Sequence, residues 1–142
     1  MTSRIVSVLT LGVTDLARSS AFYERLGFRR SNKSDEEIVW FATGGTVLAL
    51  YPWNALAEDA TVPSEGQGFR GTTMAINLSS EREVDEFLER VKSIGGTVVK
   101  QPQKVFWGGY SSYFQDPDGH LWEVAFNPFT PVDASGKLDI RE

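Results

Sequence analysis

The sequence predicts an α+β protein built from two repeated βαβββ modules. These are expected to form a curved mixed sheet, with the helices on its outer face and a ligand-binding cup on its inner face. Three observations predict this fold. The same order of strand-like and helix-like segments occurs twice, each helix-like segment ends at glycine, and a stretch rich in proline and glycine separates the two copies.

The length and composition are those of a single globular domain. The chain has 142 residues, and 41% of them are hydrophobic, which is enough for one sizeable core. We therefore interpret residues 1–142 as one domain with four parts: module one at about 4–52, a connector at about 53–71, module two at about 72–128, and a polar tail at 129–142.

Module one is predicted to begin with a strand, because Ile5 to Val13 is rich in β-branched and apolar residues. Thr14 or Asp15 is suited to cap the helix that follows, in which residues recur at three- and four-residue spacing until Gly27. Three strands are then expected, the last two joined by the hairpin signal Gly44-Gly45: Phe28–Asn32, Glu37–Ala42 and Thr46–Tyr51.

The connector and module two complete the predicted organisation. The connector is expected to hold one short helical turn at Ala55–Asp59. Module two repeats the order of module one, with Ser79 or Ser80 as the helix cap and Gly95-Gly96 as the helix end. Its strands are expected at Thr72–Leu78, Thr97–Lys100, Tyr110–Gln115 and His120–Phe126.

Charge and composition exclude several classes of function. The net charge is -5 and no run of Lys or Arg exists, so nucleic-acid and membrane partners are not expected. The absence of cysteine excludes disulfides, thiolate metal sites and a thiol nucleophile. The first residues resemble neither a signal peptide nor a membrane span, so a cytoplasmic location is expected.

Two stretches, one in each module, carry a family resemblance. The first is Leu11 to Leu16 (LGVTDL) together with Phe22-Tyr23 and Leu26 to Phe28. The second is Tyr113 to Val124 (YFQDPDGHLWEV). On the repeated βαβββ frame, these motifs resemble the vicinal-oxygen-chelate superfamily, which includes glyoxalase I, bleomycin-resistance proteins, fosfomycin-resistance enzymes and extradiol dioxygenases.

The resemblance implies metal ligands on the first and last strand of each module, facing the cup. The matching positions in this sequence are Val8, Leu48, Thr73 and Glu123. Only Glu123 is a good ligand, and one carboxylate cannot hold a divalent ion. The single histidine, His120, flanks a turn. We therefore expect no metal site and no cofactor.

The alternation of side chains along strands predicts which residues line the cup. We expect Ser112 to lie opposite Glu123 across the turn at Asp116 to Gly119, and Phe41 to lie opposite Leu48 across the other hairpin. The predicted lining is Val6, Val8, Thr10, Val39, Phe41, Leu48, Leu50, Thr73, Ala75, Asn77, Ser112, Phe114, Glu123 and Ala125.

The four tryptophans fall into two groups. Trp40 and Trp122 are expected in the core. Trp53 and Trp107 lie in or beside loops, where they are predicted to contact a ligand or a partner subunit. The glycines beside Trp107, at 108–109, fit either a hinged lid or a bulge in the strand.

These residues support one leading function and two alternatives. The leading prediction is a metal-independent, homodimeric protein that binds a small, drug-like or aromatic compound, as the bleomycin-resistance branch does. The first alternative is a glyoxalase-like lyase or isomerase that uses Glu123 as its acid-base residue. The second is a structural or regulatory partner protein, which leaves the isolated carboxylate unexplained.

Overall fold

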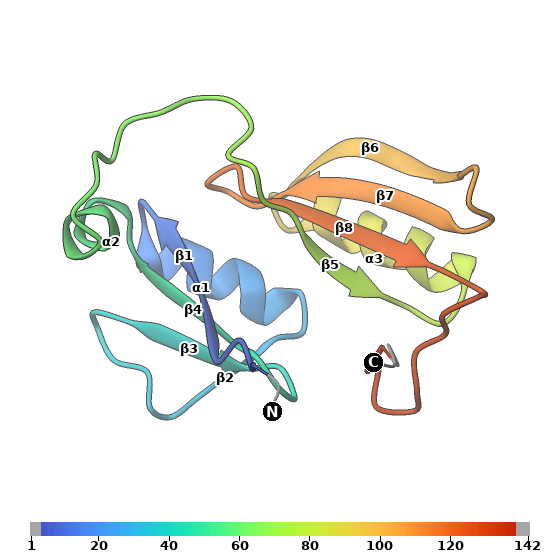
Figure 1. Ribbon diagram of the computed structural model, residues 1–142, viewed down its shortest axis with the longest axis horizontal. Coiled ribbons are helices and arrows are strands. Elements are labelled where there is room, and N and C mark those ends of the chain that lie inside the picture. Colours follow the sequence, from blue (N-terminus) through green and yellow to red (C-terminus); the bar gives the residue numbers. More distant parts are fainter. Residues whose placement is uncertain (1–3, 139–142) are drawn as a thin grey trace. The chain divides into compact units, whose positions relative to one another are not determined.

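The computed structural model of the protein describes residues 4–138, which divide into two compact units with the boundary between Arg70 and Gly71. Each unit carries one four-stranded mixed sheet, and helices pack beside both sheets (Figure 1). The predicted α+β class and the duplicated βαβββ order are confirmed. The description of the chain as a single domain, and the cup expected from both halves together, stay predictions.

Unit 1 has a mixed sheet. The strands that come first and last in its sequence, β1 and β4, pair in parallel, and the other neighbouring strands pair antiparallel. Its strand order is β1-β4-β3-β2, and helix α1 crosses between β1 and β2. The elements are β1 (Val8–Val13), α1 (Leu16–Arg25), β2 (Arg29–Arg30), β3 (Val39–Ala42), β4 (Val47–Pro52) and α2 (Trp53–Asp59). The short helix predicted in the connector is therefore confirmed as α2, and it begins slightly earlier than expected.

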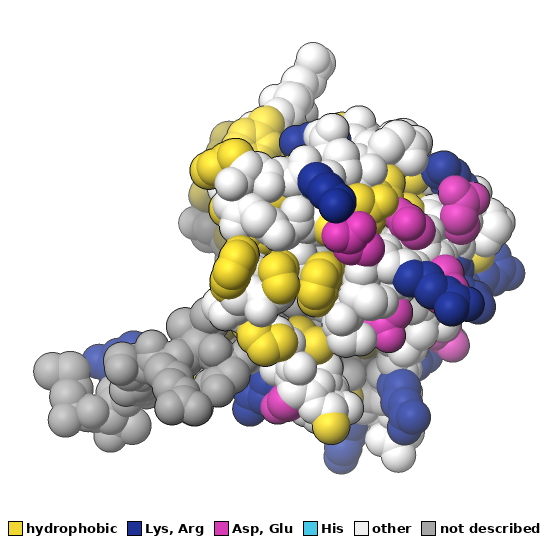
Figure 2. All heavy atoms as spheres, turned by 90° about the vertical axis from the view of Figure 1, so that its right-hand side faces the viewer, with side chains coloured by type: hydrophobic (Ala, Val, Ile, Leu, Met, Phe, Trp, Pro, Cys, Tyr) yellow, Lys and Arg dark blue, Asp and Glu magenta, His cyan; other side chains and the backbone are white. Residues whose placement is uncertain are grey.

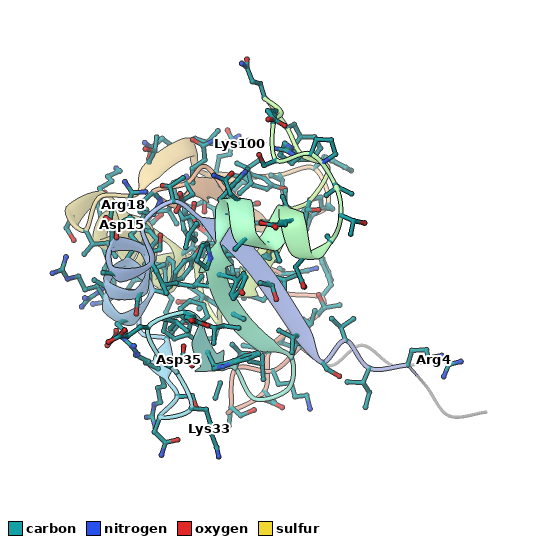
Figure 3. All side chains as sticks on the ribbon, turned by 90° about the vertical axis from the view of Figure 1, so that its left-hand side faces the viewer. Arg4, Asp15, Arg18, Lys33, Asp35 and Lys100 are labelled. Atoms are coloured by element: carbon teal, nitrogen blue, oxygen red, sulfur yellow. The ribbon has the colours of Figure 1, made fainter. Side chains whose placement is uncertain are left out.

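Helix α1 begins where the sequence predicts. The Asp15 carboxylate accepts a hydrogen bond from the backbone N–H of Arg18 at 3.0 Å, and the two residues lie together at the start of α1 (Figure 3). The helix ends before Gly27, whose φ of 105° is a conformation that glycine adopts without strain. α1 then packs its aromatic residues on the sheet, with the Tyr23 and Phe41 ring centroids 6.0 Å apart.

Unit 2 repeats this topology with a single long helix. Its strand order is β5-β8-β7-β6, with β5 and β8 parallel. The elements are β5 (Met74–Asn77), α3 (Glu81–Ser93), β6 (Thr97–Lys104), β7 (Tyr110–Gln115) and β8 (Leu121–Phe126). Ser80 caps α3 by accepting from the Glu83 N–H at 3.1 Å, while the Glu83 carboxylate accepts from the Ser79 N–H at 2.8 Å.

The core of unit 2 lies between α3 and one face of its sheet. Val84, Leu88 and Val91 of α3 are fully or almost fully buried. They pack on a sheet face whose centre is Phe114, stacked on Trp122 with ring planes 4° apart. Trp122 thus belongs to the core, as predicted. The opposite face of this sheet carries no helix of the described part of unit 2.

A glycine on β1 allows α2 to pack closely on unit 1. Figure 3 shows α2 beside β1 and β4. A Cβ atom on Gly12 would lie 3.3 Å from both Cα and Cε3 of Trp53 and 3.5 Å from Leu56. The close approach of the helix therefore depends on the missing side chain at this position.

We expect Gly12→Val to lower the free energy of unfolding by about 1–3 kcal/mol, because its methyl groups have no space beside α2. Urea denaturation measures the change. Gly45→Val is the matched control, since no atom lies within 4 Å of a Cβ at Gly45. Equal stability losses in the two variants would contradict the close packing of α2.

Within residues 4–138, none of the helices has both the length and the hydrophobicity that a membrane-spanning segment needs.

Candidate functional site

Glu123 lies at the centre of the helix-free face of the unit 2 sheet. Its carboxylate Oε2 accepts a hydrogen bond from the Ser111 hydroxyl, with 2.7 Å between the oxygens. Tyr113 stands directly opposite Glu123 in the β7–β8 ladder. Directly opposed residues share a face of the sheet with Cβ atoms about 5 Å apart, so the tyrosine and the carboxylate are immediate neighbours.

Small or neutral side chains lie on the β5 side of this pair, whereas Lys100 of β6 lies opposite Tyr113. Ala75 of β5 lies opposite Glu123, and Asn77 lies opposite Ala125. We call the six residues Ala75, Asn77, Ser111, Tyr113, Glu123 and Ala125 the open face of unit 2. The sharing of a face by Glu123, Ala125, Ala75 and Asn77 agrees with the sequence expectation, whereas Ser111 and Tyr113 were not anticipated.

The electrostatics of the open face are those of a single carboxylate. Burial of Tyr113, and next the charge of Glu123, raise the pKa of the Tyr113 hydroxyl above its ordinary value. The hydroxyl therefore stays protonated at neutral pH and keeps its proton for donation. In the described part of the chain, Glu123 makes no ion pair, and Ser111 is its only hydrogen-bond donor.

The expected placement of Ser112 and Phe114 beside Glu123 is wrong. Both lie on the helix face: Phe114 is in the core, and the buried Ser112 hydroxyl donates to the carbonyl of Val124 at 2.8 Å. The cause is the turn between β7 and β8. His120 belongs to the loop, because its carbonyl accepts from the Asp116 N–H at 3.0 Å, so pairing begins at Gln115 and Leu121. This extra residue moves the opposite strand by one position and turns every side chain to the other face.

The expected placement of Phe41 and Leu48 on an inner face is also wrong, although their predicted pairing is confirmed. Phe41 is fully buried beside Tyr23 of α1, and Leu48 is 3% exposed. Val39 and Leu50 share this face and are equally buried. The reason is that α1 covers the face with the larger aliphatic and aromatic side chains, which buries the most apolar area.

The face of the unit 1 sheet that points away from α1 holds residues for which the sequence predicted different places. Val8 and Thr10 pair with Val47 and Ala49, so all four lie on the face away from α1. Trp40 pairs with Ala49 and shares that face, which contradicts its predicted place in the core. Val6 and Thr73 precede β1 and β5, and both are exposed.

Trp53 is held by the connector. Its indole N–H donates to the carbonyl of Ser64 at 3.0 Å, and the guanidinium carbon of Arg70 lies 5.8 Å from the ring centroid. These contacts, together with the packing on Gly12, give Trp53 a structural task in unit 1. Its predicted contact with a ligand stays a prediction.

Trp107 lies in the tight turn between β6 and β7. The Val105 N–H donates to the carbonyl of Gly109 at 3.0 Å, which closes the turn. The two alternatives for this segment, a hinged lid and a strand bulge, stay predictions. A Cβ on Gly109 would overlap the Trp107 ring, and Trp107 is 37% exposed. Figure 2 shows several hydrophobic side chains at the surface of the face that it draws. Contact between Trp107 and a ligand stays a prediction.

The donor atoms at the family's metal positions do not fit a divalent cation. Val8 has no donor atom, Thr73 offers a neutral hydroxyl, and Glu123 offers one carboxylate. Leu48 faces α1, and its neighbours on the other face, Val47 and Ala49, have no donor atoms either. Among residues 4–138, no group of three or more His, Cys, Asp or Glu side chains is arranged to hold an ion.

Comparisons with known proteins agree with this fold. Residues 4–124 match the family model described as the Glyoxalase/Bleomycin resistance protein/Dioxygenase superfamily. The chain is 43% identical over 120 residues to the fosfomycin resistance protein FosX of Listeria monocytogenes, covering 84% of this chain and 86% of that protein. It is 29% identical over 120 residues to the metallothiol transferase FosB of Shouchella clausii, covering 84% of this chain and 77% of that protein.

A solved structure supports the same assignment. The crystal structure of a glyoxalase-related enzyme from Fulvimarina pelagi superposes with a TM-score of 0.85 and 35% identity, covering 96% of this chain and 98% of that chain. The family model spans most of the sequence, and both motifs that carried the resemblance, 11–16 and 113–124, lie inside it. The chain is therefore a member of the Glyoxalase/Bleomycin resistance protein/Dioxygenase superfamily.

Proposed function

We propose that this protein binds a small organic molecule without a metal ion, and that Glu123 on the open face of unit 2 is the residue that anchors the ligand. The observation that carries the proposal is the Ser111–Glu123 hydrogen bond on a helix-free sheet face. Ser111 fixes one carboxylate oxygen, while Oε1 accepts no hydrogen bond from the described residues and is available to a ligand.

The Glu123 carboxylate is the only strong metal donor at the four family positions, which supports a mechanism without a metal ion. The names of its FosB relatives describe metallothiol transferases. A divalent ion held by one carboxylate and one neutral hydroxyl would lack the ligands that such ions require. We therefore do not transfer the metal-dependent reaction to this chain.

Glu123→Gln is expected to leave the fold intact and to weaken ligand binding at least about tenfold, since a charge-assisted hydrogen bond is lost at almost constant volume. The test begins with native mass spectrometry of the freshly purified protein, to identify a ligand that co-purifies. Titration calorimetry with that ligand then compares wild type with the variant.

The metal-free part of the proposal has its own test. Elemental analysis and calorimetric titration with zinc, nickel and manganese are expected to show no stoichiometric site of sub-micromolar affinity. Such a site, abolished by Glu123→Ala, would overturn the proposal and favour a metalloenzyme. Large loss of thermal stability in Glu123→Gln with normal ligand binding would instead assign Glu123 a structural role.

A second candidate function is a glyoxalase-like lyase or isomerase. It is favoured by the pairing of Glu123 with Tyr113, because a carboxylate base beside a protonated phenol can serve both directions of a proton transfer. Turnover of a carbonyl substrate in the presence of a chelator, lost in Glu123→Gln, would select it over simple binding. The expected homodimer and cytoplasmic location stay predictions.

A further inference from the structure

The charge on the open face of unit 2 is not neutralised by the protein. Glu123 is half-buried between β5 and β7, and it has no cationic partner in the described part of the chain. A partly desolvated carboxylate without a counter-ion attracts a cation more strongly than an exposed one does. Since one carboxylate and one neutral hydroxyl are too few ligands for a divalent ion, we do not assign this role to a metal.

The nearest cationic residue on the sheet does not fill the role either. Lys100 of β6 pairs with Tyr113, so the tyrosine stands between the lysine and Glu123 in the row across the sheet. β6 is the edge strand, and the Lys100 side chain is exposed (Figure 3). No ion pair joins Lys100 to Glu123.

The groups around Glu123 are chemically complementary to a protonated amine, which donates hydrogen bonds and carries a positive charge. Oε1 can accept an N–H bond, while the Ser111 hydroxyl, which is only 4% exposed, holds Oε2 in place. The Tyr113 ring beside the carboxylate offers a π-face to a cation. Ala75 is exposed and ends at Cβ, so this neighbour leaves the carboxylate uncovered.

We propose that the open face of unit 2 recognises a primary or secondary ammonium group attached to an apolar or aromatic body, rather than an anion. This inference rests on the proposed function and adds the charge class of the ligand. Glu123 supplies the charge and accepts from the amine, Ser111 orients the carboxylate, and Tyr113 packs against the cation.

The test uses three probes of similar size and different charge: 2-phenylethylammonium, 2-phenylethanol and phenylphosphonate. Each is titrated into the protein in a buffer with EDTA, by calorimetry or by NMR shift mapping. The ammonium is expected to bind at least about tenfold more tightly than the alcohol, and the phosphonate more weakly than both. Glu123→Gln is expected to reduce the preference for the ammonium to less than about threefold.

Two further variants isolate the contributing groups. Ser111→Ala is expected to weaken ammonium binding more than that of the alcohol, because the charged ammonium gains more than the neutral hydroxyl from the oriented carboxylate. Glu86→Gln is the matched control: it removes the same charge from an exposed position on α3, where Glu86 pairs with Arg82, and is expected to leave all three affinities unchanged.

The outcomes separate this inference from the proposed function. Equal or tighter binding of phenylphosphonate or the alcohol without metal would overturn the ammonium inference and leave metal-free binding intact. Absence of ammonium binding at millimolar concentration would also overturn the inference. Binding that appears only when zinc is added would overturn the proposed function as well.

Discussion

Phe114→Ala is expected to lower the free energy of unfolding by about 3–5 kcal/mol, the range for removing a buried aromatic side chain. Phe114 is fully buried, with its ring centroid 6.2 Å from that of Trp122 and 6.0 Å from that of Phe87. Truncation removes the layer that joins α3 to the sheet and leaves a cavity between them. Chemical denaturation followed by Trp fluorescence and circular dichroism measures the loss.

The neighbouring residue provides the matched comparison. Tyr113→Ala removes an aromatic side chain of similar size from the opposite face of the same strand, where it is only half-buried. A loss of at most about 1.5 kcal/mol is expected, from strand propensity and partial burial. A larger loss for Tyr113→Ala than for Phe114→Ala would show that the β7–β8 register is wrong, and with it the open face of unit 2.

Asp116→Ala is expected to lower the free energy of unfolding by about 2–3 kcal/mol. The buried Asp116 carboxylate accepts hydrogen bonds from the backbone N–H groups of Asp118 at 2.9 Å and His120 at 2.8 Å. Removing the carboxylate leaves both N–H groups without this acceptor in a partly buried turn. Urea denaturation gives the change in stability, and amide exchange at Asp118 and His120 reports on the turn itself.

The conservative variant separates hydrogen bonding from charge. Asp116→Asn keeps an oxygen acceptor at the same position, so it is expected to retain at least about half of the stability lost in Asp116→Ala. If both variants are as stable as wild type, the turn does not depend on this side chain. If both are equally destabilised, the negative charge matters more than the hydrogen-bond geometry.

The fold could be predicted from the sequence because its signals are local and repeated. Asp15 and Ser80 cap their helices as expected, and the strand predicted at Tyr110–Gln115 has those bounds in the structure. Pairing across the Gly44-Gly45 hairpin was also predicted correctly. Helix caps and two-residue glycine turns depend on neighbouring residues alone, so no knowledge of distant contacts is needed.

The site was harder to predict because it depends on which face of each sheet a helix covers. The resemblance to a family placed Leu48 on an inner face, but the larger apolar side chains of its strand neighbours, Val39 and Phe41, lie on that same face and are buried under α1. Comparing the sizes of the apolar side chains on the two faces would have predicted which face the helix covers. In unit 2, Phe114 is more apolar than Tyr113 and therefore occupies the core.

Ser111 and Tyr113 were missed for a different reason. The left-handed conformation of Gly119, with φ at 87°, and the Asp116 bond to the His120 carbonyl place His120 inside the loop. Turn chemistry alone predicts a turn at this position but leaves its length open by one residue. The face that β7 presents beside Glu123 depends on that single residue.

The length of this loop therefore determines the register between β7 and β8, and with it the face on which each β7 side chain lies. An insertion or deletion of one codon between Asp116 and His120 would exchange the alternate side chains that β7 offers opposite Glu123, while leaving the strand sequences unchanged. Ser111 and Tyr113 would give way to Ser112 and Phe114, which carry no phenol. In a protein built this way, the chemistry of a binding surface can change through the length of the adjoining turn, without any substitution in the strands that form the surface.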